Sequence, residues 1–130
     1  MLKQKNNDSE TINLPDIDNY MARGYRIGVI TEAKLKGQYS KESLDTKLEI
    51  SAGKHKGFKL STSFPLTYKG RRRLSYLCKA LGITGKVNPA QLIGRKLKIL
   101  VVPKKREYMG KTYINYVITR FHPIDRDIRK

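Results

Sequence analysis

The chain has 130 residues, of which 38% are hydrophobic, and its 28 Lys and Arg against 11 Asp and Glu give a net charge of +17. This length predicts one domain, and no apolar run approaches the ~18 residues of a membrane-spanning helix. The N-terminus has no apolar leader segment, so we expect a cytoplasmic protein. The single cysteine, Cys78, excludes an internal disulfide framework and a cysteine-clustered zinc site.

The positive charge belongs almost wholly to the second part of the chain. Residues 1–52 contain eight Lys or Arg and eight Asp or Glu, whereas residues 53–130 contain twenty and three. An excess of positive charge this large in one part of the chain favours a polyanionic partner. A membrane surface is the competing polyanion, but no basic amphipathic helix with a large apolar face appears. We therefore expect a nucleic-acid partner and no membrane partner.

Composition divides the chain into three parts. Residues 1–20 are polar, with few large side chains, and we expect a flexible N-terminal segment. Residues 21–124 hold the alternating apolar patterns of a folded nucleic-acid-binding domain. Residues 125–130 form a short basic C-terminal tail.

Alternation with period two predicts the first strand at Tyr25–Leu35. Gly24 and Gly28 suggest a bend or bulge in this strand. Ile30 does not follow the alternation. The side chains expected to share the buried face are Tyr25, Ile27, Val29, Thr31, Ala33 and Leu35.

Two further alternating runs predict a hairpin. Leu44–Ala52 and Phe58–Phe64 each place apolar residues at every second position, and the glycine-bounded turn Gly53–Gly57 joins them. Pro65 ends the second of these strands.

The apolar period then changes to that of a helix. Leu74, Leu77, Cys78 and Leu81 form one helical stripe, and Gly82 is a natural end. The triplet Arg71–Arg73 is placed in the first turn, where cations oppose the helix dipole. Either these arginines meet a partner or they are solvated. Asn88–Ile93 is expected to form one capped helical turn.

Arg95–Phe121 has two β-rich runs flanking a polar tip, which predicts a second hairpin. Cations mixed with aromatic rings suit a single nucleic-acid strand, because charge holds phosphates and rings stack on bases. The alternative is a solvated hairpin whose lysines keep an edge soluble. The tip carries Lys104, Lys105, Arg106, Tyr108, Lys111 and Tyr113.

The order of three strands, one helix and two strands is that of the OB-fold, a mainly β, five-stranded, partly open barrel with the helix between strands three and four. A generic α+β sandwich is the alternative. The ligand surface of an OB-fold is the outer face of strands two and three, together with the loops between strands one and two and between strands four and five. Here these loops are Lys36–Glu42 and Lys104–Lys111.

Five segments carry a resemblance to a known family: Tyr25–Lys34, Leu48–Phe58, Leu77–Ile83, Leu92–Leu97 and Tyr108–Lys111. From about Tyr25 to Pro123 the chain resembles the phage and mobile-element single-stranded-DNA-binding proteins with an OB-fold. The resemblance implies sequence-tolerant binding of single-stranded DNA in replication or recombination, with other replication or recombination proteins as possible partners. Two features depart from the family: the C-terminus is not acidic, and tryptophan is absent, so tyrosine must stack on the bases.

Tyrosines and cations near these loops and strands make up the candidate interface. Tyrosine has a stacking face and a polar end, which suits a nucleic-acid surface. Lys47 and Lys59 face outward beside serines that could bond phosphate oxygens, or else belong to a solvated face. We expect Tyr25 and Tyr116 to be structural. The candidate residues are Lys36, Tyr39, Lys47, Lys59, Arg71, Arg72, Arg73, Lys104, Lys105, Arg106, Tyr108, Lys111 and Tyr113.

No catalytic signature is present, so we expect a non-enzyme without cofactors. His55 and His122 have no Cys, Asp or Glu at ligand spacing, so we expect no metal site. Two other functions use the same charge. One is an RNA-binding OB protein, and the other is a basic interaction protein that grips an acidic host protein.

Overall fold

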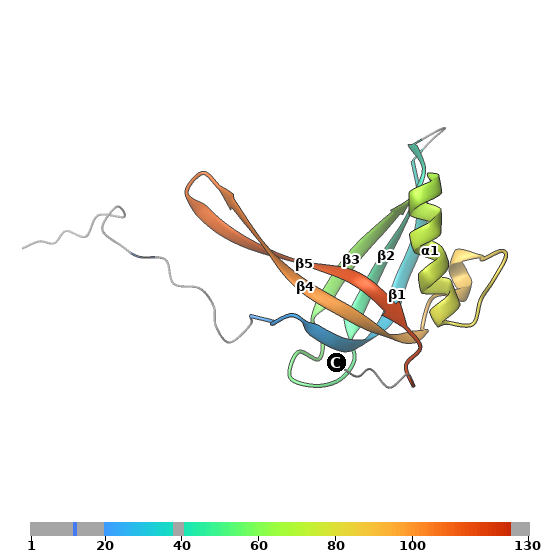
Figure 1. Cartoon of the computed structure of the whole chain (residues 1–130), viewed down its shortest axis with the longest axis horizontal. Coiled ribbons are helices and arrows are strands. Elements are labelled where there is room, and N and C mark those ends of the chain that lie inside the picture. Colours follow the sequence, from blue (N-terminus) through green and yellow to red (C-terminus); the bar gives the residue numbers. More distant parts are fainter. Residues whose placement is uncertain (1–11, 13–19, 38–40, 126–130) are drawn as a thin grey trace, which may run out of the picture.

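The fold is described from a computed structural model that covers residues 12, 20–37 and 41–125. Most of the predicted segments 1–20 and 125–130 lies outside these residues, as does Tyr39. The order of three strands, helix and two strands is confirmed (Figure 1). The elements are β1 (Gly24–Lys36), β2 (Ser43–Ile50), β3 (Lys59–Pro65), helix α1 (Tyr68–Ala80), the 3-10 turn η3 (Pro89–Gln91), β4 (Lys96–Tyr108) and β5 (Lys111–His122).

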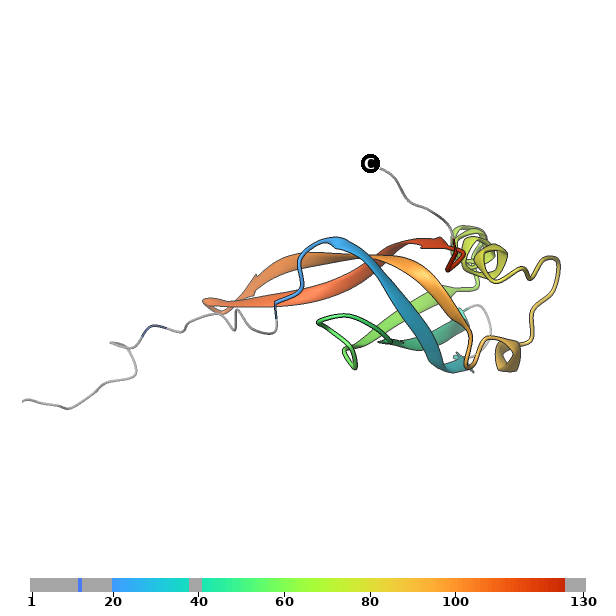
Figure 2. The same ribbon diagram turned by 90° about the horizontal axis from the view of Figure 1, so that it is seen from below.

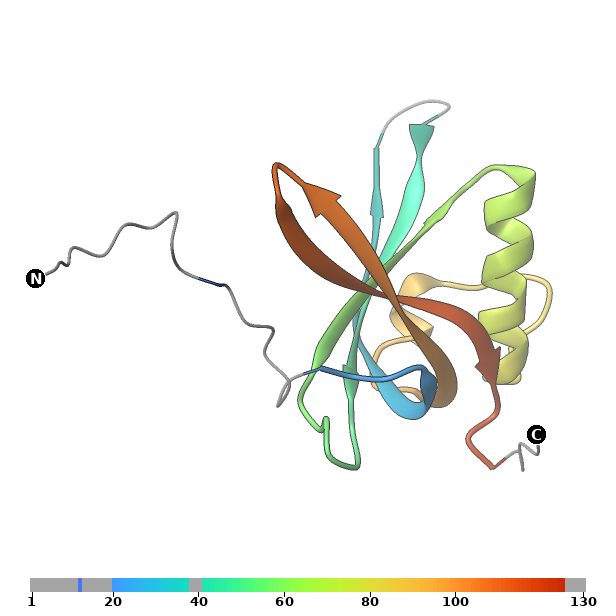
Figure 3. The ribbon, with the colours of Figure 1, turned by 60° about the vertical axis from the view of Figure 1, so that its left-hand side comes forward.

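All five strands form one open antiparallel sheet in the order β3-β2-β1-β4-β5. The outer strands β3 and β5 approach each other, and both pack against α1 (Figures 1 and 3). No hydrogen-bonded ladder joins β3 to β5 among the described strands. The mainly β class and the position of the helix are confirmed.

The predicted buried face of β1 is wrong over its first half. Ile30, which the alternation left out, is fully buried, whereas Thr31 is exposed. The cause is a β-bulge: Ile30 pairs with Leu48 and Glu32 pairs with Lys47, so Thr31 is the extra residue. One extra residue moves every later side chain to the opposite face. The buried side therefore continues at Ala33, as predicted, but the prediction is wrong for Leu35, which is 61% exposed.

The β2–β3 hairpin is confirmed, with Leu48 paired to Leu60 and Leu44 paired to Phe64. Leu44, Thr46, Leu48 and Ile50 are all buried, as their alternation predicts. The turn begins and ends at glycines with positive φ, 87° at Gly53 and 92° at Gly57, a region that side chains rarely adopt.

Helix α1 also buries the predicted stripe. Leu77, Cys78 and Leu81 are buried, and Leu74 packs against the core at its margin. The helix begins earlier than predicted, because the Thr67 side chain accepts a hydrogen bond from the Gly70 backbone N–H at 3.2 Å and caps it. Arg72 and Arg73 therefore lie in the second turn. The predicted capped turn is confirmed as η3.

Arg73 uses its guanidinium inside the protein, at the gap between the two outer strands. Nη1 donates to Thr62 Oγ1 on β3 at 3.0 Å, and Nη2 donates to the Ile118 carbonyl on β5 at 2.6 Å. The group also lies 4.8 Å from the ring centroid of Phe64 and 5.3 Å from that of Phe121. Burial lowers the pKa of Arg73. One side chain on α1 thus links both free edges of the sheet.

We predict that Arg73→Ala lowers the free energy of unfolding by about 2–4 kcal/mol, since it removes two hydrogen bonds from a charged group and leaves the Ile118 carbonyl without this donor. Urea denaturation followed by circular dichroism measures the loss. Arg72→Ala is the matched control, because Arg72 is exposed and such a change costs within about 0.5 kcal/mol. Equal urea midpoints for Arg73→Ala and Arg72→Ala would show that Arg73 does not stabilise the protein by linking β3 to β5.

We predict that Cys78 is chemically inert in the folded protein. Its side chain is buried, and burial raises the pKa of the thiol, so the reactive thiolate is scarce at neutral pH. Labelling by a maleimide should be at least about tenfold slower in native protein than in urea. Equal rates in the two conditions would contradict the packing of α1.

Candidate nucleic-acid interface

The β4–β5 hairpin extends beyond the sheet as a two-stranded ribbon, here called the arm (Lys104–Asn115) (Figures 1 and 2). Its turn is only Met109 and Gly110, with φ of 52° and 78°, the signature of a type I′ hairpin turn. The predicted loop at Lys104–Lys111 is therefore wrong. Apart from the two turn residues, this segment consists of paired strands.

One face of the arm alternates cations with tyrosines. Cross-strand partners in an antiparallel pair point to the same side, so the register defines this outer face. Tyr108 and Tyr113 are 67% and 48% exposed, and each stands opposite a cation. The outer-face pairs are Lys104–Asn115, Arg106–Tyr113 and Tyr108–Lys111.

The opposite, inner face of the arm is of different character. It carries the pairs Lys105–Ile114 and Glu107–Thr112, on the same side as the buried Ile118. Glu107 is the arm's one acidic residue, so its carboxylate does not lie among the outer cations.

Tyr116 fixes the base of the arm to the body of the protein. Its hydroxyl accepts a hydrogen bond from the Met21 backbone N–H at 3.0 Å. Its ring meets Phe58 edge-on, with centroids 5.1 Å apart. The structural role predicted for Tyr116 is confirmed.

The arm cations form no ion pair with any residue that the structure describes. Their charge is thus not offset by a carboxylate in contact. Lys104, Arg106 and Lys111 on the outer face can therefore approach phosphate oxygens without first breaking an interaction within the described protein.

The predicted face on β2 and β3 is different, because acids accompany its lysines. Lys36 lies 3.7 Å from an Asp45 carboxylate oxygen, and Lys47 lies 3.8 Å from Glu32. Lys34 pairs with the same Glu32 at 3.8 Å. Lys59 is exposed and forms no ion pair among the described residues.

Asp45 also engages the serines that were expected to face phosphate. Its Oδ1 accepts hydrogen bonds from Ser63 Oγ at 2.7 Å and from Ser43 Oγ at 3.0 Å. The hydrogen bond from Ser63, with smaller effects of Ser43 and Lys36, lowers the pKa of Asp45 below its ordinary value. The Asp45 carboxylate, whose ionised form these hydrogen bonds favour, borders a groove of about 310 Å³.

The arginine triplet does not act as one group. Arg71 and Arg72 are exposed on α1, whereas Arg73 is turned inward to β3 and β5. The donors of Arg73 are thus engaged within the fold, whereas Arg71 and Arg72 keep the exposure that the predicted contact requires. The predicted set divides among the arm, the β1–β3 face and α1, and Tyr39 lies outside the described residues.

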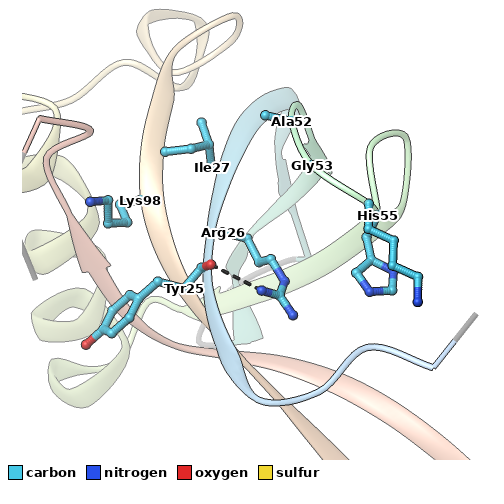
Figure 4. Close-up of a pocket in the computed structure, with 8 residues that line it drawn as sticks. Tyr25, Arg26, Ile27, Ala52, Gly53, His55 and Lys98 are labelled. Atoms are coloured by element: carbon cyan, nitrogen blue, oxygen red, sulfur yellow. Dashed lines mark hydrogen bonds between the residues drawn. The ribbon is translucent and has the colours of Figure 1, made fainter. Parts of the chain in front are cut away.

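Sequence reasoning missed an open groove of about 550 Å³ beside the start of β1 (Figure 4). Arg26 and His55 lie on one side of β1, and Tyr25 and Lys98 lie on the other. Arg26 is held in place because its Nη2 donates to the Ala22 carbonyl at 3.0 Å. The groove is lined by Tyr25, Arg26, Ile27, Ala52, Gly53, Lys54, His55 and Lys98.

Cations and an imidazole around an open groove suit phosphate oxygens. The available signal was the turn Gly53-Lys54-His55-Lys56-Gly57, whose basic residues follow the strand that pairs with β1. Tyr25, expected to be structural, packs its ring 5.7 Å from His122 and also borders this groove.

Within the described ranges, no three His, Cys, Asp or Glu side chains are grouped so that they could hold a metal ion. No helix in the same ranges is long and apolar enough to cross a membrane. The chain matches no protein-family model and no curated protein. Functional assignment therefore depends on the geometry and charge of the surface.

Proposed function

We propose that this protein binds single-stranded DNA, largely independently of sequence and without catalysis, during replication or recombination of a phage or other mobile element. The outer face of the arm is the main support. It presents cations beside exposed tyrosines and holds no carboxylate. Rings stack on any base and cations hold any phosphate, so such a surface tolerates sequence.

The fold adds support to the resemblance with OB-fold single-stranded-DNA-binding proteins. The strand order β3-β2-β1-β4-β5, with β3 near β5 and the helix between β3 and β4, is compatible with an OB barrel. In that fold the connection between strands four and five flanks the ligand. The arm occupies this position. We propose that the fold is an OB barrel whose edges meet without a continuous ladder.

We propose a non-enzymatic role that uses no cofactor or metal. Hydrolysis of a phosphodiester by metal ions needs carboxylates at the bound strand, and the arm offers only Glu107, on its inner face. The place of action that we propose is the cytoplasm, where a replicating mobile element exposes single strands.

We predict that the protein binds a single-stranded DNA more tightly than the duplex of the same sequence. Fluorescence anisotropy with DNA single strand, DNA duplex and RNA single strand makes the comparison. For ~5 neutralised phosphates the slope of log affinity against log salt should be about −3.5. Tighter binding of RNA would assign the surface to RNA, and a slope near zero would remove nucleic acid as the partner.

We predict that the two faces of the arm differ in effect. Tyr108→Ala and Tyr113→Ala should each weaken binding by about 1–3 kcal/mol even at high salt, since stacking is not screened by ions. Arg106→Gln should flatten the salt slope by about 0.7, the contribution of one phosphate contact. The measurement is anisotropy titration over a range of salt concentrations.

Lys105→Gln is the matched control for Arg106→Gln. It removes the same charge from the neighbouring residue on the inner face, so its effect on the slope should be smaller. Identical slopes for the two variants would show that the arm acts only through its total charge. Unchanged high-salt affinity in a folded Tyr108→Ala/Tyr113→Ala variant would show that the bases are held elsewhere.

A further inference from the structure

Helix α1 carries a second basic surface that the fold does not use. The helix contains five Lys or Arg and no Asp or Glu. Apart from Arg73, these cations are exposed and form no ion pair within the described chain. Two large rings are exposed beside them, since Tyr68 is 80% and Tyr76 is 53% accessible.

Helical geometry gathers these residues into one line. Positions four residues apart are neighbours on a helix surface, so Tyr68, Arg72 and Tyr76 follow one another, and Lys79 continues the row. We call this row the α1 stripe. It extends over about 16 Å at 1.5 Å per residue. The opposite side of helix α1 is buried and holds Leu77 and Cys78.

The start of the helix makes the charge of α1 costly unless an anion approaches. Lys69 and Arg71 lie in the first turn, which contains no acidic residue. Cations there oppose the positive end of the helix dipole. A phosphate near the stripe would offset this repulsion, whereas no carboxylate of the described chain pairs with these side chains.

The α1 stripe and the arm lie on different sides of the molecule. In all three ribbon views α1 and the tip of the arm are far apart, with the sheet between them (Figures 1, 2 and 3). The buried side of α1 packs on β3 and β5, so its exposed side looks away from the sheet. The arm and the stripe therefore form two separate surfaces of the molecule.

We propose that the α1 stripe binds a second single strand, so that one protein molecule bridges two nucleic-acid strands. This inference rests on the proposed function, because the arm must hold the first strand. The stripe combines Arg72 and Lys79, which suit phosphates, with Tyr68 and Tyr76, which suit bases. The interleaved rings favour a nucleic-acid strand over an acidic protein as its occupant. Bridging raises the local concentration of one strand near another and would speed the pairing of complementary strands.

Native mass spectrometry of the full chain with two non-complementary DNA oligonucleotides of about eight nucleotides tests the proposal, since one OB-fold covers about 4–16. The wild type should form complexes of one protein with two oligonucleotides. The Arg72→Gln/Lys79→Gln variant should stop at one, with its first affinity reduced less than about threefold. A complementary pair should also anneal several-fold more slowly with this variant than with wild type.

Lys96→Gln/Arg120→Gln is the matched control, because it removes one lysine and one arginine from exposed residues of β4 and β5 that form no ion pair within the described chain. It should keep both oligonucleotides. Circular dichroism and urea midpoints establish that each variant is folded.

Each contrary result has a distinct meaning. The bridging proposal is overturned if the wild type binds only one oligonucleotide or binds two only as a protein dimer. It is also overturned if the Arg72→Gln/Lys79→Gln variant still binds two. Each of these results leaves single-strand binding intact. No complex with any oligonucleotide would overturn the proposed function as well. Loss of poly-glutamate binding by that variant, with two oligonucleotides still bound, would assign the stripe to an acidic protein and overturn the proposal.

Discussion

The guanidinium of Arg73 holds together a sheet that its own ladder does not close. The outer strands β3 and β5 have free edges, and free edges expose unpaired backbone groups. Arg73 donates to Thr62 on one edge and to the Ile118 carbonyl on the other, while two phenylalanine rings flank it. A planar group with several fixed donors can serve two strands at once, which the point charge of lysine does less well.

This linkage also determines where the arm begins. Ile118 lies two residues after Tyr116, and Tyr116 is tied to Met21 and Phe58. The body of the protein therefore holds β5 at Tyr116 and Ile118, two successive inward-facing positions next to the base of the arm. Beyond them the ribbon depends on its own cross-strand pairs, and its faces are set by the register that the anchored part fixes.

The uneven distribution of charge along the sequence gives the folded protein two kinds of surface, one with ion pairs on β1–β3 and one dominated by cations on the arm and α1. Acids of the first part of the chain stand beside lysines of the same part, as Glu32 does with Lys34 and Lys47. The arm and α1 come from the part with few acids, and their cations form no ion pair with any residue in the described part of the chain. Exposed ion pairs are worth only about 0–1 kcal/mol, so the β1–β3 face is not closed to a strand. Its acids nevertheless make it less attractive to a nucleic-acid strand than the arm or α1.

Much of the fold was predictable because its strongest signals are local. The β2–β3 alternation and the core-facing apolar row Leu74, Leu77, Cys78 and Leu81 specify their elements directly. The bulge at Thr31 was not, because the position of one unpaired residue is decided by the pairing of β1 with β2. Its trace in the sequence is Ile30, which breaks the alternation, whereas the glycines placed the bulge at Gly24 and Gly28. The arm looked like a loop because Lys104–Tyr108 is polar on both faces, and the alternation of strands is visible only where one face is buried. The arm and the exposed arginines were found as candidate binding residues, but the groove at Arg26 was not.

Arg73 shows why the candidate site could not be read residue by residue. Three adjacent arginines are equivalent in sequence, yet each helical step turns the side chain by about 100°, so Arg72 faces solvent and Arg73 faces the sheet. The arm shows the same effect with period two, where Lys105 and Arg106 point to opposite faces. Its two-residue turn keeps Met109 at a φ of 52°, a conformation that costs about 1–3 kcal/mol outside glycine. In return the two strands stay in register up to the tip. Tyr108 and Tyr113 are then held on one face before any strand binds, and less conformational entropy is lost on binding than a flexible loop would lose.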